Sequence, residues 1–204
     1  MNVHVELRRI GEQPIRRQRL SVVRRIDLHL IAEVASGRNG GQLGTGQRAG
    51  AEELEAELGF TRAKALFDVA EEAKAHLLEF ASVNKIEIDF RPGHLNVSHK
   101  KRTLPEYVEH AEAMRTRFNY PHIHYMDAAE TAERMGSTHY YGGVRDTGTG
   151  HIHPLNFAIG LAKAAATAGA RIHEQSEVLE LIPGPKATLK TAEGQVIADH
   201  VILA

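Results

Sequence analysis

Glycine is concentrated between Ser36 and Arg48, where five of the thirteen residues are glycines. Glycine lets a backbone adopt positive φ and approach a ligand closely, and successive N–H groups in such a turn form an anion site. Arg38 and Arg48 would add fixed positive charge. The pattern fits a loop that contacts a ligand, and equally a solvated turn. It is not a P-loop, because no Gly-Lys-Ser/Thr follows, and it lacks the order Gly-x-Gly-x-x-Gly.

Two histidine pairs offer a different chemistry. In extended segments, His122 and His124 would share one face, as would His151 and His153, so either pair could grip a divalent metal. A zinc site needs three or four converging ligands, however, and nothing in the sequence brings the pairs together. We therefore favour polar histidines in loops and predict no metal site.

Composition sets the outer limits. The chain has 204 residues, a formal net charge of −1, 42% hydrophobic residues and no cysteine. This length suffices for one substantial core, and the balanced charge makes nucleic-acid binding an unlikely function. No run approaches the roughly 20 apolar residues that cross a bilayer, so no membrane association is expected. Without cysteine, a redox role requires a bound cofactor.

Residues 1–34 form an atypical lead. Seven arginines lie between Arg8 and Arg25, and no lysine precedes Lys64. Three interpretations compete: a basic arm that binds nucleic acid, an Arg-rich targeting peptide, and the product of a shifted reading frame or misassigned start. The single serine, together with Glu6 and Glu12 among the arginines, argues against a targeting peptide. We favour the third interpretation and expect residues 1–34 to be disordered or loosely attached.

Hydrophobic periodicity and turn residues predict a mixture of helices and short strands. The expected helices cover Ala63–Ala81, Leu104–Phe118 after a capping box at Thr103 and Glu106, the segment between Asp127 and Gly136, and Pro154–Gly169. The expected strands are Ile86–Phe90 and His94–Ser98, joined by a turn at Arg91–Gly93, followed by Arg171–His173, Val178–Ile182, Ala187–Thr191 and Val196–Leu203.

Several motifs follow one another in the order used by a family of flavoenzymes. They are ASGRNGGQ at Ala35–Gln42, YYGG at Tyr140–Gly143, GHIHPLN at Gly150–Asn156 and VILA at Val201–Ala204. With them the chain resembles the FAD-dependent oxidoreductases of the D-amino-acid-oxidase type, nearest the bacterial gamma-glutamylputrescine oxidase branch. The resemblance runs from about Ala35 to the end. Neither the Gly-x-Gly-x-x-Gly unit that opens the family's fold nor its second half is found, so a fragment is expected.

The resemblance implies a mixed α/β fold: an incomplete Rossmann-like FAD-binding domain at 35–85 and 146–204, and part of an antiparallel substrate domain at 86–145. It implies FAD as cofactor and a cytoplasmic location. His153 would face the substrate. The cofactor would contact Ser36, Arg38, Asn39, Gly40, Gly41 and Gln42 with its ribityl chain and ring, Val178 with its adenine, and Ala204 with its pyrophosphate.

These assignments compete with plainer ones. Arg38 could be a surface arginine, Ser36 and Asn39 could form turns through their own side chains, and His153 could cap or pack the following helix. No catalytic residue is identified.

The reaction implied is hydride transfer to flavin from a carbon that bears an amine in a small molecule, with hydrolysis of the imine and reoxidation by oxygen. Without the dinucleotide turn, the chain is expected to bind FAD weakly or not at all. The alternative is a non-catalytic remnant or binding module.

Overall fold

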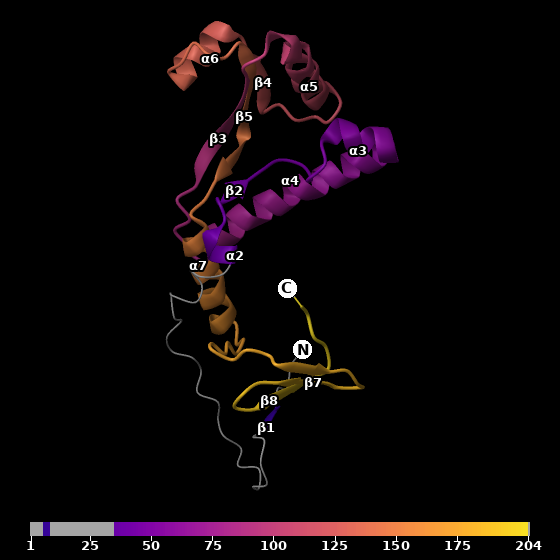
Figure 1. The fold of residues 1–204 in the computed structure, drawn as a ribbon, viewed down its shortest axis with the longest axis vertical. Coiled ribbons are helices and arrows are strands. Elements are labelled where there is room, and N and C mark those ends of the chain that lie inside the picture. The colour runs from indigo at the N-terminus through magenta and orange to yellow at the C-terminus, as the bar shows by residue number, and fades with distance from the viewer. Residues whose placement is uncertain (1–5, 9–34, 204) are drawn as a thin grey trace. The chain divides into compact units, whose positions relative to one another are not determined.

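The computed structural model describes residues 6–8 and 35–203 (Figure 1). Nearly all of the predicted disordered lead, residues 1–34, lies outside the described residues. The chain divides into two compact units, one formed by Ile31–Ala164 and the other by Met1–Leu30 together with Ala165–Ala204. The division falls near the end of one helix, α7 (Pro154–Thr167). The predicted domains, 35–85 with 146–204 and 86–145, are drawn at other boundaries and stay a prediction.

An antiparallel sheet organises the unit Ile31–Ala164. Its strands are β2 (Gln42–Leu43), β3 (Arg91–Ser98), β4 (Ile123–Met126) and β5 (Gly142–His151). Strand β5 pairs with each of the other three, and β3 follows it along its length, with an irregularity between Pro92 and His94. Because β3 occupies one side of β5, β2 and β4 share the other side at its two ends.

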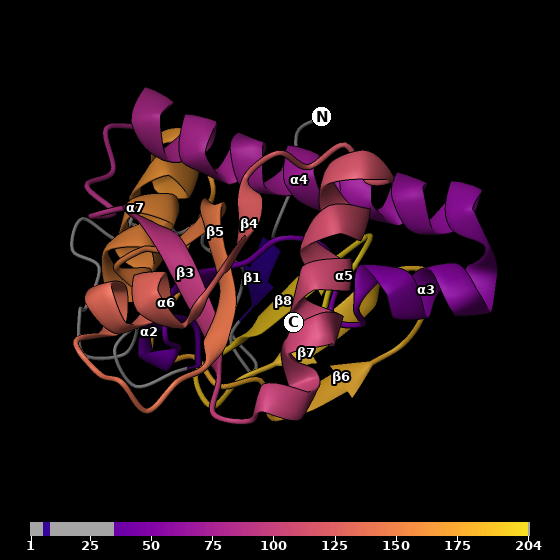
Figure 2. The same ribbon diagram turned by 90° about the horizontal axis from the view of Figure 1, so that it is seen from above.

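The helices of this unit follow the apolar periodicity of the sequence. The longest, α4 (Figure 2), buries Ala63, Phe67 and Ala81, and most of its charged side chains are exposed, as predicted. Gly59, with φ of 80°, separates it from the preceding helix. The helices are α2 (Ala35–Arg38), α3 (Ala51–Leu58), α4 (Phe60–Val83), α5 (Leu104–Thr116), α6 (Ala128–Met135) and α7, and a short 3-10 turn, η1 (Lys101–Thr103), precedes α5.

Two hydrophobic clusters form the core of this unit. The larger joins α4, α5 and the sheet, and its aromatic rings meet edge to face. The centroid of the Phe67 ring lies 5.5 Å from the ring centroids of both Phe118 and Tyr120. The smaller joins the far end of α4 to the start of α7, through Ala81, Ile88 and Ile152.

The second unit contains an antiparallel sheet in the order β1-β8-β7-β6. Its strands are β1 (Glu6–Arg8), β6 (Glu180–Ile182), β7 (Ala187–Lys190) and β8 (Gln195–Ala198). The predicted strands at 178–182, 187–191 and 196–203 are thus present in shortened form. The predicted strand Arg171–His173 was wrong, since these residues have no regular secondary structure.

The predicted strand Ile86–Phe90, and the turn after it, were also wrong. The segment is irregular, with Asp89 at φ of 46°, and Arg91–Gly93 instead opens β3. Its backbone bonds go elsewhere: Ile86 N donates to Ala81 O at 2.8 Å, and Ile88 O accepts from His153 N at 2.6 Å. The apolar residues of this segment pack into the smaller cluster, so their alternation belongs to a loop between α4 and β3.

The capping box at Thr103 was wrong as well. Thr103 makes no side-chain cap, because its hydroxyl lies 2.6 Å from Ser98 Oγ and 2.9 Å from Lys100 O. The cap of α6 is confirmed, since Asp127 accepts a hydrogen bond from Glu130 N at 2.9 Å. Gly136 ends α6 in the left-handed conformation, with φ of 64°. The predicted mixture of helix and strand is therefore confirmed.

Thr131 of α6 is fully buried, and within the described residues its hydroxyl has no hydrogen-bond partner. An unpaired buried hydroxyl costs free energy, so Thr131→Val is expected to raise the free energy of unfolding by about 1 kcal/mol in urea denaturation. Thr103→Val is the matched control. It removes a hydroxyl that is hydrogen bonded, and it should destabilise by about 1 kcal/mol. Equal effects of both substitutions would contradict this account.

Candidate functional site

The glycine loop is held in place by side-chain and strand contacts. Asn39 donates from Nδ2 to Ser36 O at 2.9 Å and accepts from Gly41 N through Oδ1 at 2.8 Å. Gln42 then pairs with His151 in the sheet, and Ile152 N donates to Gly41 O at 2.8 Å. The loop is therefore fixed against the end of β5, and Asn39 performs the turn role that sequence reasoning left open.

The glycines of the loop differ in what they need. At Gly41, φ is +65° and an added Cβ would lie 2.0 Å from Ile152 O, so the fold itself requires glycine. At Gly40, an added Cβ would meet nothing within 4 Å, and φ is not positive. Packing among the described residues therefore does not explain Gly40. The open face beside it is the kind of space that a closely approaching planar group requires.

The other predicted site residues lie in separate places. Arg38 is exposed at the end of α2. His153 precedes α7, and its Nδ1 accepts from Asn156 N at 3.3 Å, which is a capping contact. Val178 belongs to the second unit and is 46% exposed, and Ala204 lies outside the described residues. The roles assigned to these residues by resemblance stay predictions.

The histidine pairs have separate surroundings. The His122 ring lies 5.2 Å from the Tyr120 ring, and His124 Nε2 lies 3.5 Å from Glu130. His151 lines a cavity on β5. In the part of the chain that the structure describes, no three histidine, aspartate or glutamate side chains gather as metal ligands would.

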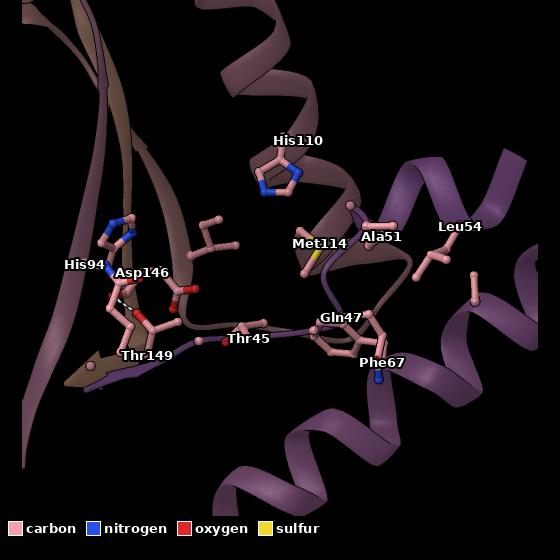
Figure 3. A pocket seen from close by; sticks show the side chains of 18 of the residues that line it. Thr45, Gln47, Ala51, Leu54, Phe67, His94, His110, Met114, Asp146 and Thr149 are labelled. Carbon is pink, nitrogen blue, oxygen red and sulfur yellow. Dashed lines mark hydrogen bonds between the residues drawn. The ribbon is translucent and has the colours of Figure 1, made fainter. Parts of the chain in front are cut away.

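A cavity of about 360 Å³ begins where the glycine loop ends. Figure 3 shows His94, Asp146 and Thr149 on the strand side and His110 and Met114 on α5 across from them. Its floor and sides are largely apolar, with Leu54, Ala63, Phe67, Met114 and Ile123 contributing. The size falls in the range of small-molecule sites.

A chain of hydrogen bonds runs along one side of this cavity. Tyr120 Oη donates to Asp146 Oδ1 at 2.6 Å and lies 2.7 Å from Thr45 Oγ1. Lys74 Nζ in turn donates to Thr45 Oγ1 at 2.9 Å and pairs with Glu71 at 2.7 Å. Burial, together with the bond to Asp146, raises the pKa of Tyr120, so the phenol stays protonated and acts as donor.

Sequence reasoning missed this network entirely. Its members are spread from Thr45 to Asp146, and only Glu71 and Lys74 share a segment. The one usable signal was an acid within the Gly- and Thr-rich strand after Val144, where a charged side chain would need partners.

The family model described as DAO, FAD dependent oxidoreductase, matches residues 17–204. The chain belongs to this family. The match begins at residue 17, earlier than the expected start near Ala35. FAD is accordingly the cofactor of this FAD-dependent oxidoreductase, as predicted, and the open face at Gly40 is compatible with a flavin.

Curated relatives agree. The chain is 47% identical over 88% of its length to a "Probable oxidoreductase OrdL" of Rhizobium meliloti, covering 42% of that protein. It is 35% identical over 83% of its length to the gamma-glutamylputrescine oxidoreductase of Escherichia coli, covering 40% of it. The chain thus spans about two fifths of the length of these relatives.

Solved structures share the fold. Glycine oxidase from Bacillus cereus matches with a TM-score of 0.64 at 22% identity, over 82% of this chain and 44% of that one. The FAD-bound L-alpha-glycerophosphate oxidase of Mycoplasma pneumoniae matches with a TM-score of 0.56 at 18% identity, over 79% and 40%. Among the described residues of the oxidoreductase, no helix has the length and apolar character needed to cross a membrane.

His110 and Glu52 form a partly exposed pair at the cavity, 2.6 Å apart. The hydrogen bond raises the pKa of His110 above 6.5 and lowers the pKa of Glu52 below 4.5. The His110 contribution to stability is complete below its ordinary pKa and lost as pH rises through the raised one. The Glu52 contribution is present above its ordinary pKa and lost as pH falls through the lowered one.

We therefore expect His110→Gln to destabilise the protein in urea near about pH 6 and to have less effect near about pH 9. The loss should stay below about 1 kcal/mol and shrink in high salt, because both side chains are some 40% exposed. His76→Gln, at an exposed position of α4, is the control and should show no such pH dependence. A pH-independent effect of His110→Gln would contradict the assignment.

Proposed function

We propose that this chain carries part of an enzyme that oxidises a carbon bearing an amine in a small molecule, with FAD bound along Ser36–Gln42. The open face at Gly40 carries the proposal for the loop, since no atom of the described residues would lie within 4 Å of a Cβ added there. The amine class is supported by relatives and neighbours whose names include gamma-glutamylputrescine oxidoreductase and glycine oxidase.

When bound, FAD supplies a two-electron acceptor for the C–H bond next to the amine. The residues of this chain provide position and charge. The turn made by Asn39 holds Gly40 and Gly41 in a fixed conformation, so the loop needs no rearrangement to receive a planar ring. Arg38 supplies permanent positive charge near this turn, which favours electron acceptance by a neighbouring group.

The position of Gln42 links this loop to the cavity. Gln42 is the last residue of the proposed cofactor loop and also lines the cavity described above. A substrate in the cavity would therefore lie next to the cofactor loop, with the apolar residues of α4 and α5 limiting access of water.

The loop assignment predicts opposite effects for neighbouring glycines in a flavin fluorescence titration. Wild type should bind FAD saturably but weakly, above the low micromolar range, because the dinucleotide turn is absent from the chain. Gly40→Ala should weaken binding about tenfold further without loss of stability, because its Cβ enters only the open face. Gly41→Ala should instead unfold or destabilise the protein.

Gly44→Ala is the matched control, because its Cβ also meets nothing within 4 Å but it lies beyond the proposed loop. It should leave both stability and FAD affinity unchanged. Saturable binding that is indifferent to Gly40→Ala, or no binding at all, would contradict the placement of the cofactor.

The amine assignment predicts which compounds reduce the flavin. With FAD added under anaerobic conditions, a panel of primary and secondary amines should bleach the flavin absorbance, and alcohols of the same carbon skeleton should not. Flavin that binds but is bleached by no amine would refute oxidation by this chain and favour a binding module.

A further inference from the structure

Asp146 is a buried carboxylate with one oxygen unused. Its side chain is 8% exposed, and Oδ1 accepts both from Tyr120 Oη at 2.6 Å and from Gly148 N at 2.9 Å. Within the described residues no hydrogen bond to Oδ2 is found. Among the described residues, the fully enclosed side-chain oxygens without a hydrogen-bond partner are Glu55 Oε2 and the Thr131 hydroxyl. Oδ2 of Asp146 is not one of them, so it is not fully enclosed, and it opens towards the cavity that Asp146 lines.

The charge of Asp146 has no bonded cationic partner at the cavity wall. Of the described lining residues, Asp146 is the only aspartate, glutamate, lysine or arginine. The ammonium group in the network, Lys74, is engaged by Glu71 and Thr45. His110 is hydrogen bonded to Glu52, and Asp146 acts on it through space without a direct bond. Since no described lysine or arginine bonds the buried carboxylate, a cationic ligand group is a natural complement.

The remainder of the wall defines what accompanies that cation. Leu54, Phe67 and Met114 line the part of the cavity away from Asp146 (Figure 3), while Ile123 pairs with Asp146 in the sheet. The volume of about 360 Å³ admits a small aliphatic chain. His94, His151 and Thr149 add polar groups to the wall.

We propose that Asp146 binds the protonated amino group of a short aliphatic amine. A carboxylate stabilises the ammonium form of its partner, whereas the nitrogen next to an oxidised carbon must be unprotonated. If the proposed function holds, the amine that Asp146 binds is therefore not the one that reacts. The substrate then carries two basic groups separated by an apolar chain.

The test uses butylammonium, a singly charged probe, and its neutral isostere 1-butanol, titrated by calorimetry into the chain without FAD. Butylammonium should bind at least about tenfold more tightly than 1-butanol. Asp146→Asn should abolish that preference, since the amide keeps the oxygen that accepts from Tyr120 and Gly148 and loses only the charge. Asp199→Asn, an exposed acid of the other unit, is the control and should preserve it.

Each remaining outcome overturns the proposal: no binding of butylammonium, equal binding of both probes, or a preference that survives Asp146→Asn while that variant retains wild-type unfolding in urea. If Asp146→Asn fails to fold, the comparison of the two probes on wild type decides. No flavin is present, so failure here is distinct from failure of the loop assignment, which the Gly40→Ala titration measures separately.

Discussion

Antiparallel pairing along β5 is the constraint on which the rest of this unit depends. One strand of ten residues accepts β3 along one side and both β2 and β4 along the other, so segments from three distant parts of the chain acquire fixed positions together. Pairing at His151 holds the glycine loop, and pairing at Asp146 brings in the segment after Tyr120. The register of the strands paired with β5 therefore positions both the glycine loop and the cavity.

The parts of the fold that sequence predicted are those with local causes. The stripe from Ala63 to Ala81 has the helical period, Asp127 can reach the N–H three residues later, and Gly136 can adopt positive φ. Each of these features depends on residues close by in the sequence, so the local sequence is enough to predict it. The family motif around Gly40 was likewise contiguous, which is why the cofactor could be predicted from it.

The errors arose where tertiary contacts outweighed local pattern. Ile86, Ile88 and Phe90 alternate as in a strand, but the smaller cluster takes all three into a loop. Thr103 lies three residues before Glu106, as in a capping box, but its hydroxyl is hydrogen bonded to Ser98 of the preceding strand. The network at Asp146 could not be read from sequence for the same reason, since Thr45 and Tyr120 are 75 positions apart and only the sheet register unites them.

Helix α4 serves two cores with one face. Its first half packs Phe67 into the larger cluster, its last turns pack Ala81 into the smaller, and between them Glu71 and Lys74 present charge to the network beside the cavity. The stripe from Ala63 to Ala81 is therefore apolar, polar and apolar in succession over about 27 Å. An element supported in this way opens at either end separately. Loosening around the glycine loop can thus leave the aromatic core intact.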